Sequence, residues 1–349
     1  MTSSRKIAVV GAGIAGLACA RTLVQAGRTI TLLEQRPVAG GRTASQATPY
    51  GSFDSGAQYF TVRDPRFEQA LAATEVARRP WNANAVRVLD PLGRVAEAAM
   101  PSLEPHWVAV PAMDTLASQW LQPLTASGGV QLQTRVTRIE PDALDRRHWQ
   151  LQTSGPGDSV HVYSGFDTVL LAMPHALAGG LLRQSNLAPR LTERIEQVEV
   201  APCWTLMLAF PQAVQPTMSH LGPQWNAAHS THHRVAWVAR ESSKPGRSAI
   251  ERWTVQASPK WSQEHLEDDE PRVQAKLLKA FAEVTGIRAE PASAQVHRWR
   301  WARTERPLGS SHLWDRASGL GACGDWCLGH RMEDAFVSGL ELALAVLRG

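Results

Sequence analysis

The strongest hydrophobic pattern of the chain lies near its amino terminus. Residues 7–10 are Ile-Ala-Val-Val, a run without polar residues that is typical of a strand buried on both faces of a sheet. Residues 17–26 then place apolar side chains at helical spacing, and Gly27 ends this predicted helix. A second apolar strand covers residues 29–33 and ends on Glu34. The pattern predicts a complete βαβ unit.

The rest of the chain alternates between strand-like and helix-like segments. Strands are predicted in 85–98 (a pair about the turn 90–93), 130–134, 149–153, 161–163, 166–174, 203–210, 234–240, 252–257, 296–301 and 319–326. Helical spacing predicts helices over 66–77, 114–121, 176–182, 270–285 and 332–347. The block 176–296 mixes strands with helices, which suggests a second domain built on an antiparallel sheet.

A glycine-rich turn lies between the first strand and its helix, with the sequence Gly11-Ala12-Gly13-Ile14-Ala15-Gly16. Its spacing is the G-x-G-x-x-G fingerprint of dinucleotide-binding domains. Gly11 permits the tight turn, Gly13 lets the backbone approach a pyrophosphate, and Gly16 lets helix and strand pack closely. Free N–H groups at the helix start attract phosphate, and Glu34 has the position of the acid that binds a ribose. The agreement of strand, glycines, helix and acid favours a bound dinucleotide over an empty turn.

A second glycine pair follows in the run Gly40-Gly41-Arg42. Simple nicotinamide enzymes do not need it, whereas many flavoproteins have it, because the backbone passes close to the ribose and pyrophosphate and the arginine adds a cation. At these residues the chain resembles the FAD-dependent amine-oxidase-like superfamily. The resemblance implies FAD as the cofactor rather than NAD.

The totals restrict the class of protein. A chain of 349 residues with 44% hydrophobic and 19% charged residues is ordinary for a soluble protein of two domains. The net charge of +4 comes mainly from scattered arginines, so nucleic-acid binding is disfavoured. No apolar run approaches the ~20 residues of a membrane span, and the first strand leaves no room for a signal peptide. We therefore expect a cytoplasmic protein. The four cysteines lack metal-binding spacing, so reduced thiols and no metal are expected.

Further runs narrow the resemblance to the bacterial renalases, a group within the same superfamily. These runs are 53–61 (Phe-Asp-Ser-Gly-Ala-Gln-Tyr-Phe-Thr), 202–204, 261–262, 297–299 and 323–328 (Cys-Gly-Asp-Trp-Cys-Leu). The implied reaction oxidises the 2- or 6-dihydro isomers of NAD(P). Hydride passes to flavin N5, and dioxygen then reoxidises the flavin and yields hydrogen peroxide. Such a reaction needs a slot that stacks the nicotinamide on the flavin and no protein base, and no nucleophile–base motif stands out in the sequence.

The resemblance also implies the cofactor site and the fold class. The fold class is α/β (α+β overall), with a Rossmann-type FAD-binding domain and a second, mixed or antiparallel-sheet substrate domain. The expected boundaries are 1–65, 105–175 and 296–349 for the FAD-binding domain, and 66–104 and 176–295 for the substrate domain. Asp325 is expected to bind the ribityl chain, and the helix after it to point its positive end at the flavin. The implied FAD-binding residues are Gly11, Gly13, Ile14, Ala15, Gly16, Glu34, Gln35, Gly41, Arg42, Gly56, Ala57, Gln58, Val136, Gly324, Asp325, Arg331, Met332 and Ala335.

Candidate substrate residues follow from the aromatic content. The chain has 13 Trp against 3 Tyr and 7 Phe, and although many indoles belong to a core by default, some could roof a slot for a flat substrate. The candidate catalytic or substrate-contacting residues are Gln58, Tyr59, Trp204, Trp261, Trp299 and Arg240. Structural roles are favoured for His175 and His297. Metal binding by His229, His232 and His233 is disfavoured. A role for Lys260 like that of the lysine near flavin N5 in amine oxidases is also disfavoured.

Two rival functions stay open at this stage. One is an amine oxidase or desaturase on the same fold, and the other is a flavin-binding sensor without enzymatic activity. The expected partners are a small-molecule substrate, a dihydronicotinamide dinucleotide in the favoured interpretation, and O2. Neither nucleic acid nor a membrane is expected as a partner, and the protein is expected to be a monomer or weak dimer.

Overall fold

A six-stranded sheet forms the centre of the first lobe. The computed structural model describes residues 5–75, 78–81, 86–98, 104–214 and 225–349. The strands of this sheet are, in spatial order, β19 (Leu313–Asp315), β20 (Leu320–Ala322), β13 (Thr168–Leu171), β1 (Lys6–Val10), β2 (Thr29–Leu33) and β9 (Val130–Gln131). All neighbours are parallel except β19 and β20. The predicted βαβ unit is therefore present, with α1 (Ile14–Gln25) as its helix.

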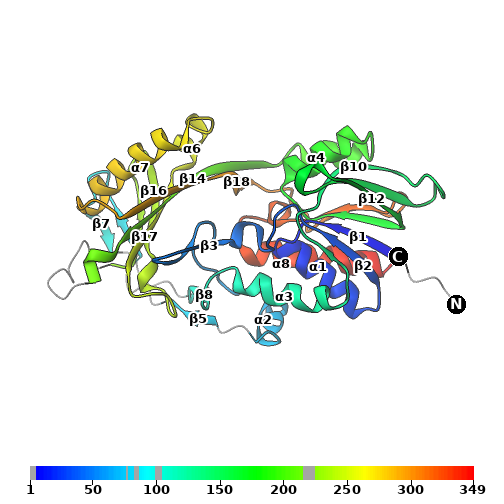
Figure 1. The fold of residues 1–349 in the computed structure, drawn as a ribbon, viewed down its shortest axis with the longest axis horizontal. Helices are drawn as coiled ribbons and strands as arrows, with labels where there is room; N and C mark the ends of the chain where they lie inside the picture. The colour runs from blue at the N-terminus through cyan, green and yellow to red at the C-terminus, as the bar shows by residue number, and fades with distance from the viewer. Residues whose placement is uncertain (1–4, 76–77, 82–85, 99–103, 215–224) are drawn as a thin grey trace.

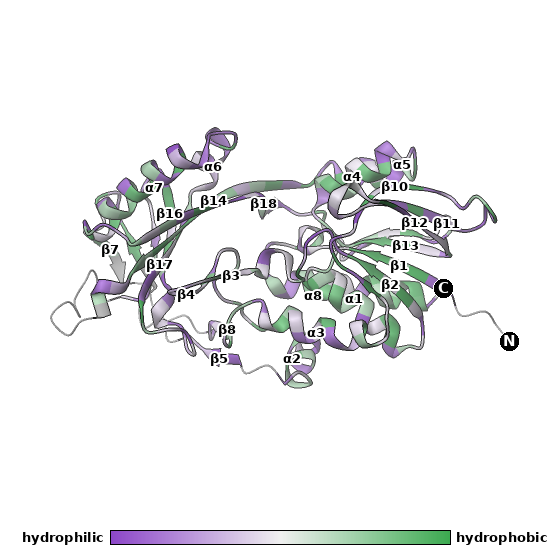
Figure 2. Cartoon of the chain, viewed as in Figure 1, coloured by the Kyte–Doolittle hydropathy of each residue, from purple (hydrophilic) through white to green (hydrophobic). Residues whose placement is uncertain are grey.

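Both faces of this sheet are covered, which explains why residues 7–10 of β1 and 169–171 of β13 are all apolar. Ile7 and Val9 pack with one group of helices, namely α1, α2 (Pro65–Ala72), α3 (Thr115–Ala126) and α8 (Met332–Leu347). Ala8 and Val10 face a second layer, made of the antiparallel strands β10 (Arg135–Pro141), β11 (Trp149–Ser154) and β12 (Val160–Phe166) with helices α4 (His175–Gln184) and α5 (Pro189–Ile195). Figure 2 shows the hydrophobic residues concentrated in β1, β2 and α1.

A seven-stranded sheet forms the second lobe. Its order is β18 (Ser293–Arg306), β14 (Glu199–Phe210), β17 (Glu251–Ala257), β16 (Val235–Arg240), β15 (Ala227–Ser230), β6 (Val86–Leu89) and β7 (Val95–Ala98), antiparallel except for β15 with β6. The long strands β14 and β18 reach from this sheet toward the first lobe (Figure 1). These two sheets confirm the predicted fold class.

The two faces of the second sheet differ in what covers them. Trp204, Leu206 and Leu208 of β14 pack with α6 (Pro259–Glu264) and α7 (Glu270–Thr285) on the outer face. Met207 and Ala209 point to the inner face, where they contact Phe53 of the hairpin β3 (Ser45–Thr48) and β4 (Gly51–Asp54). A short antiparallel pair, β5 (Arg78–Pro80) with β8 (Trp107–Ala109), lies below β3 in the view of Figure 1. The inner face therefore lies toward the loop that follows β4.

Several predicted element ends differ from the structure. Helix α2 ends at Ala72 rather than at residue 77, and α3 continues to Ala126 past Pro123. The strand predicted over 130–134 ends at Gln131, because the backbone turns at Gln133, which has a φ of 53°. Strand β18 is much longer than residues 296–301, because it pairs with β14 along most of its length.

The domain boundaries stay a prediction, and packing bears on two of them. The α2 residue Phe67 contacts Phe336 of α8, which favours placing α2 with the first lobe. Strand β18 pairs with β14, which favours placing all of it with the second. Within the described residues, no helix combines the length and the apolar character needed to cross a membrane.

Candidate functional site

The amino end of α1 is an open backbone cradle. Gly13 is the N-cap residue, with extended φ and ψ, and no side chain caps this helix end. A Cβ built on Gly13 would meet no atom of the protein within 4 Å. The first N–H groups of the helix therefore point into space that a phosphate could fill, as expected for Ile14 and Ala15.

The other two glycines of the motif serve packing. A Cβ on Gly16 would lie 1.9 Å from the Gly11 carbonyl oxygen, and Gly11 has a φ of 107°. Neither position can therefore accept a side chain without movement of the backbone. A similar restriction joins α8 to this helix, since a Cβ on Gly339 would lie 2.0 Å from the Ala15 carbonyl oxygen.

Glu34 is held at the end of β2 by backbone donors. Its Oε2 accepts a hydrogen bond from Ala12 N at 2.7 Å, and its Oε1 accepts one from Arg36 N at 2.8 Å. The residue is buried, so the carboxylate is fixed beside the glycine turn with Gln35 next to it in the chain. Its remaining lone pairs suit ribose hydroxyls. Val136, the predicted adenine neighbour, is buried near the start of β10.

Two motifs from opposite ends of the chain meet in an ion pair. Arg42 donates to both carboxylate oxygens of Asp325, with a distance of 2.7 Å from Nη1 to Oδ2. His175, at the start of α4, lies near both groups; its Nδ1 is buried and has no hydrogen-bond partner among the described residues. Burial lowers the pKa of His175, with Asp325 opposing and Arg42 adding to that shift. The His175 imidazole could therefore form a hydrogen bond with a ligand through Nδ1.

The loop after β4 is fixed from both lobes. Ala57 N donates to the Arg42 carbonyl at 2.9 Å, and a Cβ on Gly56 would lie 2.0 Å from that same oxygen. From the second lobe, Gln256 Nε2 donates to Gly56 O at 2.7 Å and Trp299 Nε1 donates to Ser55 O at 2.9 Å. This loop therefore lies between the nucleotide motif and the inner face of the second sheet.

The glycine cradle, the Arg42–Asp325 pair and this loop together fit FAD, because they offer phosphate donors, polar groups for the ribityl chain and a backbone that allows close approach. Ala57, Tyr59, Met332 and Ala335 all pack against the hydrophobic core of the first lobe. Two carboxylates modify the start of α8. Glu333 accepts from Arg63 N and Asp64 N at 2.6 Å each, and Asp334 accepts from Arg331 N at 2.9 Å. They offset part of the positive helix end expected to face the flavin.

Five aromatic side chains are grouped around Tyr59, and we call them the Tyr59 cluster: Tyr59 itself, Trp81, His106, Trp237 and, in contact with Trp237, His229. The Tyr59 ring stacks on His106 with centroids 4.0 Å apart and lies 5.9 Å from Trp237 and 6.4 Å from Trp81. His229 contacts Trp237 edge-on at 4.7 Å. Trp237 Nε1 is buried and, within the described ranges, has no hydrogen-bond partner. The cluster therefore offers flat walls and one unused N–H donor.

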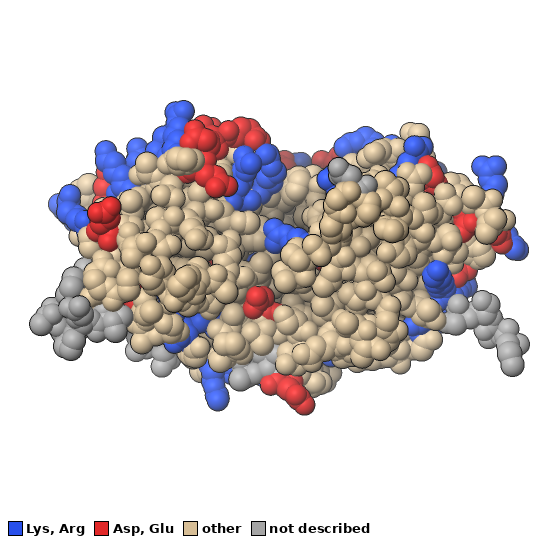
Figure 3. All heavy atoms as spheres, viewed as in Figure 1, with Lys and Arg blue, Asp and Glu red and all other residues tan. Residues whose placement is uncertain are grey.

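Two arginines, Arg303 and Arg331, influence the pKa values of residues in this cluster. Burial raises the pKa of Tyr59, while Arg331 and Arg303 oppose that shift. Burial and the charge of Arg303 both lower the pKa of His229. The nearby acid Glu104 forms an ion pair with Arg63. Figure 3 shows Lys and Arg atoms in the hollow between the two lobes.

The predicted substrate residues do not form one group. Trp204 and Trp261 lie in the core on the outer face, where Trp204 Nε1 donates to His265 O at 3.0 Å. Trp299 lies on the inner face, close to the guanidinium of Arg36. Arg240 pairs with Glu251 at 3.0 Å and covers Trp253. Of the predicted residues, only Gln58 and Tyr59 lie on the loop itself, and no sequence motif pointed to Trp81, His106 or Trp237.

The remaining candidates have structural settings. Lys260 is exposed on α6, and His232 pairs with Glu283 at 3.1 Å. Among the described residues, no three His, Cys, Asp or Glu side chains are grouped to hold a metal ion.

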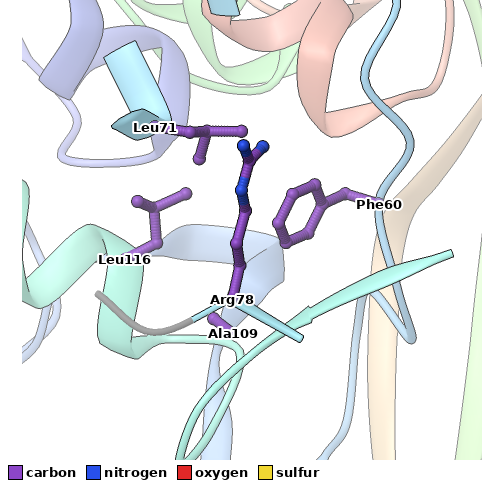
Figure 4. A pocket seen from close by; sticks show the side chains of 5 residues that line it. All are labelled: Phe60, Leu71, Arg78, Ala109 and Leu116. Atoms are coloured by element: carbon purple, nitrogen blue, oxygen red, sulfur yellow. The ribbon is translucent and has the colours of Figure 1, made fainter. Parts of the chain in front are cut away.

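Two hollows are lined by residues outside the Tyr59 cluster. One of about 10 Å³ is lined by Phe60, Leu71, Arg78, Ala109 and Leu116 (Figure 4), and one of about 330 Å³ by Gln197, Arg306, Pro307 and Leu308. The first has room for about one water molecule.

Two family models match the sequence. Residues 9–74 match the NAD(P)-binding Rossmann-like domain, and residues 103–347 match the flavin containing amine oxidoreductases. Putrescine oxidase of Kocuria rosea is 49% identical over 57 residues, which is 16% of this chain and 12% of that protein. Hydroxyneurosporene desaturase of Cereibacter sphaeroides is 44% identical over 59 residues, which is 17% of this chain and again 12% of the relative. These matches thus span a small part of the curated relatives' length.

Solved structures extend the similarity to the whole fold. A candidate protoporphyrinogen oxidase from Exiguobacterium sp. 255-15 superposes with a TM-score of 0.78 and 15% identity, covering 100% of both chains. Wild-type putrescine oxidase bound to putrescine gives a TM-score of 0.68 and 13% identity, covering 99% of both chains. At these identities the likeness shows the fold alone.

Proposed function

This chain belongs to the family of flavin-containing amine oxidoreductases and uses FAD, and from that premise we propose that it oxidises isomeric dihydronicotinamide dinucleotides. The proposed substrates are the 2- or 6-dihydro forms of NAD(P), with O2 as the final electron acceptor and hydrogen peroxide as a product. FAD would supply the redox chemistry, since it accepts a hydride and returns the electrons to O2.

One observation carries this proposal: the Tyr59 cluster combines flat walls with positive charge. A dihydronicotinamide dinucleotide is planar at its reacting ring and anionic at its phosphates. Tyr59, His106 and Trp237 suit the ring, and Arg303 and Arg331 suit the phosphates. The unused Trp237 N–H suits the carboxamide oxygen.

The roles of the protein's own residues follow from this assignment. The aromatic side chains would orient the ring and exclude water, and the arginines would hold the phosphates. No side chain needs to take a proton, because loss of a hydride converts the dihydropyridine into an aromatic cation. The five members of the Tyr59 cluster include no carboxylate, and such chemistry needs none. Binding and orientation are then the main contributions of the protein.

A second candidate function is amine oxidation, which the similarity to putrescine oxidase favours. A polyamine is a cation at neutral pH and would need carboxylates near the reacting ring. Glu104, an acid whose charge acts on the pKa of Tyr59, is already paired with Arg63. Like charge from Arg303 and Arg331 would oppose binding of an amine. The electrostatic environment therefore supports the dinucleotide.

Anaerobic mixing tests the two candidates directly. We expect 2- and 6-dihydro-NAD(P) to bleach the visible flavin absorbance within the time of manual mixing. Benzylamine, putrescine and ordinary NAD(P)H should do so much more slowly. If an amine reduces the flavin as fast as the isomers do, the proposal fails and amine oxidation replaces it. If nothing in the panel reduces the flavin, the sensor alternative is favoured.

Reversing the charge of Arg303 should weaken binding of the dinucleotide. Loss of a charge-assisted contact costs about 1.5–3 kcal/mol, and exposure lowers this value, so Arg303→Glu should raise KM for the isomers roughly tenfold. The effect should shrink as salt increases, because salt screens exposed charges. Steady-state oxidation of the isomers at two ionic strengths measures this.

Strand β18 offers a matched control for that variant. Arg306 has 61% side-chain exposure against 59% for Arg303, and each has a glutamate partner. Arg306→Glu should leave KM unchanged, and an N-methyl dihydronicotinamide, which lacks phosphates, should not distinguish the variants. Equal KM increases in both variants would show a general charge effect and would remove Arg303 from the phosphate site.

A further inference from the structure

Four charged side chains lie buried together behind the loop that follows β4. We call Asp54, Glu241, Lys244 and Arg247 the buried charge cluster. The side chains of Asp54, Glu241 and Lys244 have no exposed surface, and that of Arg247 is 1% exposed. Lys244 Nζ lies 2.9 Å from Asp54 Oδ2 and 2.9 Å from Glu241 Oε1. Arg247 Nη2 lies 2.8 Å from Asp54 Oδ2. Burial of so many charges is expensive unless each is compensated.

Lys244 connects this cluster to the proposed site. Its Nζ also donates to Gln58 Oε1 at 3.2 Å, and Gln58 Nε2 in turn donates to Gly56 O at 3.1 Å. The same ammonium lies 5.5 Å from the ring centroid of Trp81, a member of the Tyr59 cluster. One lysine from the turn between β16 and β17 thus contacts both the loop and the aromatic wall.

The two carboxyl groups of the cluster have different surroundings. Asp54 Oδ1 accepts from Ser45 Oγ at 2.8 Å and Met113 N at 3.1 Å, and Oδ2 receives both cations. Although burial acts to raise the pKa of Asp54, Lys244 and Arg247 hold it at about 2. Glu241 Oε1 accepts from Lys244 and Thr254, whereas its Oε2 is buried without a partner in the described residues. Burial raises the pKa of Glu241, and the neighbouring Asp54 charge adds to the effect, while Lys244 and Thr254 oppose it.

We propose that Lys244 is a positioning residue that fixes the Asp54–Gln58 loop against the second sheet and places one uncompensated positive charge behind it. Three buried cations, Lys244, Arg247 and Arg252, interact with two buried acids, Asp54 and Glu241. No solvent screens the surplus of positive charge. A positive charge there favours the anionic reduced state of a flavin bound beside residues 56–60. The inference rests on the proposed placement of the flavin ring at this loop and does not depend on the identity of the substrate.

Redox titration of the FAD-loaded protein against a reference dye tests this without any substrate. At a fixed dye potential, Lys244→Met should lower the ratio of reduced to oxidised flavin at least tenfold, which is about 30 mV for a two-electron couple. Glu241→Gln, which keeps the shape of the side chain and removes no cation, should not lower the ratio. An unchanged ratio in Lys244→Met, or equal shifts in both variants, would overturn the proposal.

A second variant guards against misfolding, because removing one partner of a buried ion pair is strongly destabilising. Lys244→Met with Glu241→Gln leaves Asp54 and Arg247 as a neutral pair and should fold. Its ratio should lie at least tenfold below that of Glu241→Gln alone, and equal ratios in these two variants would refute the role of Lys244. Failure of the dinucleotide proposal would appear only in the substrate panel, so the two failures are distinguishable.

Discussion

Gly13→Asp should abolish FAD binding and leave the apoprotein slightly more stable than before. The backbone of Gly13 is extended, with φ −73° and ψ 178°, and a Cβ there meets nothing within 4 Å. Aspartate is a preferred N-cap residue, so it should stabilise α1 by about 0.5 kcal/mol. The same carboxylate would occupy the space of the pyrophosphate and repel it. Because two unit charges 4 Å apart near a protein surface interact by about 4 kcal/mol, affinity should fall at least about 100-fold.

Flavin content after reconstitution and thermal unfolding of the apoprotein measure the two effects. Gly180 supplies a control, since it lies within α4 and its Cβ position is also free of neighbours. Gly180→Ala should keep full FAD occupancy, with a gain in stability of about 0.5–1 kcal/mol. Retention of FAD by Gly13→Asp would place the pyrophosphate elsewhere, and an unfolded apoprotein would contradict the open cradle.

The nucleotide-binding half of the fold could be predicted because its signals are local. Residues 7–10 lack polar side chains since β1 is covered on both faces, and Gly11 and Gly16 are required by contacts within one βαβ unit. Helix α8 was predicted with its observed bounds, because its amphipathic pattern is uninterrupted. The membership of the chain in a flavin-containing family agrees with those signals.

The Tyr59 cluster could not be predicted in this way. Its members come from four separate segments, and a strand's alternation does not say which face will be covered. Trp204 and Trp237 have the same side chain on neighbouring parts of one sheet, yet helices α6 and α7 cover the first while Tyr59 contacts the second. The choice of face depends on where distant helices pack. Tryptophan content, together with the family resemblance at residues 202–204 and 261–262, therefore favoured Trp204 and Trp261.

Lys244 illustrates the same limit for charged residues. Lysine in a turn rich in serine, proline and glycine is usually solvated, and nothing local distinguishes Lys244 from Lys260. Its burial depends on Asp54, which lies 190 residues earlier in the chain. Asp54 in turn requires Ser45 and Met113 for its remaining hydrogen bonds. Such a network exists only after the two lobes have packed together.

Asp325→Ala should weaken FAD binding more than it weakens the fold. Asp325 is 4% exposed, and a charged hydrogen bond from it to a ribityl hydroxyl would be worth about 1.5–3 kcal/mol. The Kd for FAD should therefore rise roughly 10- to 100-fold. Arg42, which loses its partner, remains 30% exposed and can be hydrated, so the apoprotein should lose little stability. Fluorescence titration of apoprotein with FAD, beside thermal unfolding, measures both quantities.

The ion pair itself could mimic this result, because Asp325 also orients Arg42. A double-mutant cycle separates the two roles. If Asp325 acts only through Arg42, then Asp325→Ala adds nothing to the loss caused by Arg42→Met. If its carboxylate binds the ribityl chain, the second substitution should still raise the Kd roughly tenfold in the Arg42→Met background. Asp145→Ala removes a comparable arginine-paired acid from the protein surface and should leave the Kd unchanged. We expect the additional tenfold loss, because Asp325 lies where the chain leaves β20, at the edge of the parallel sheet where nucleotides bind.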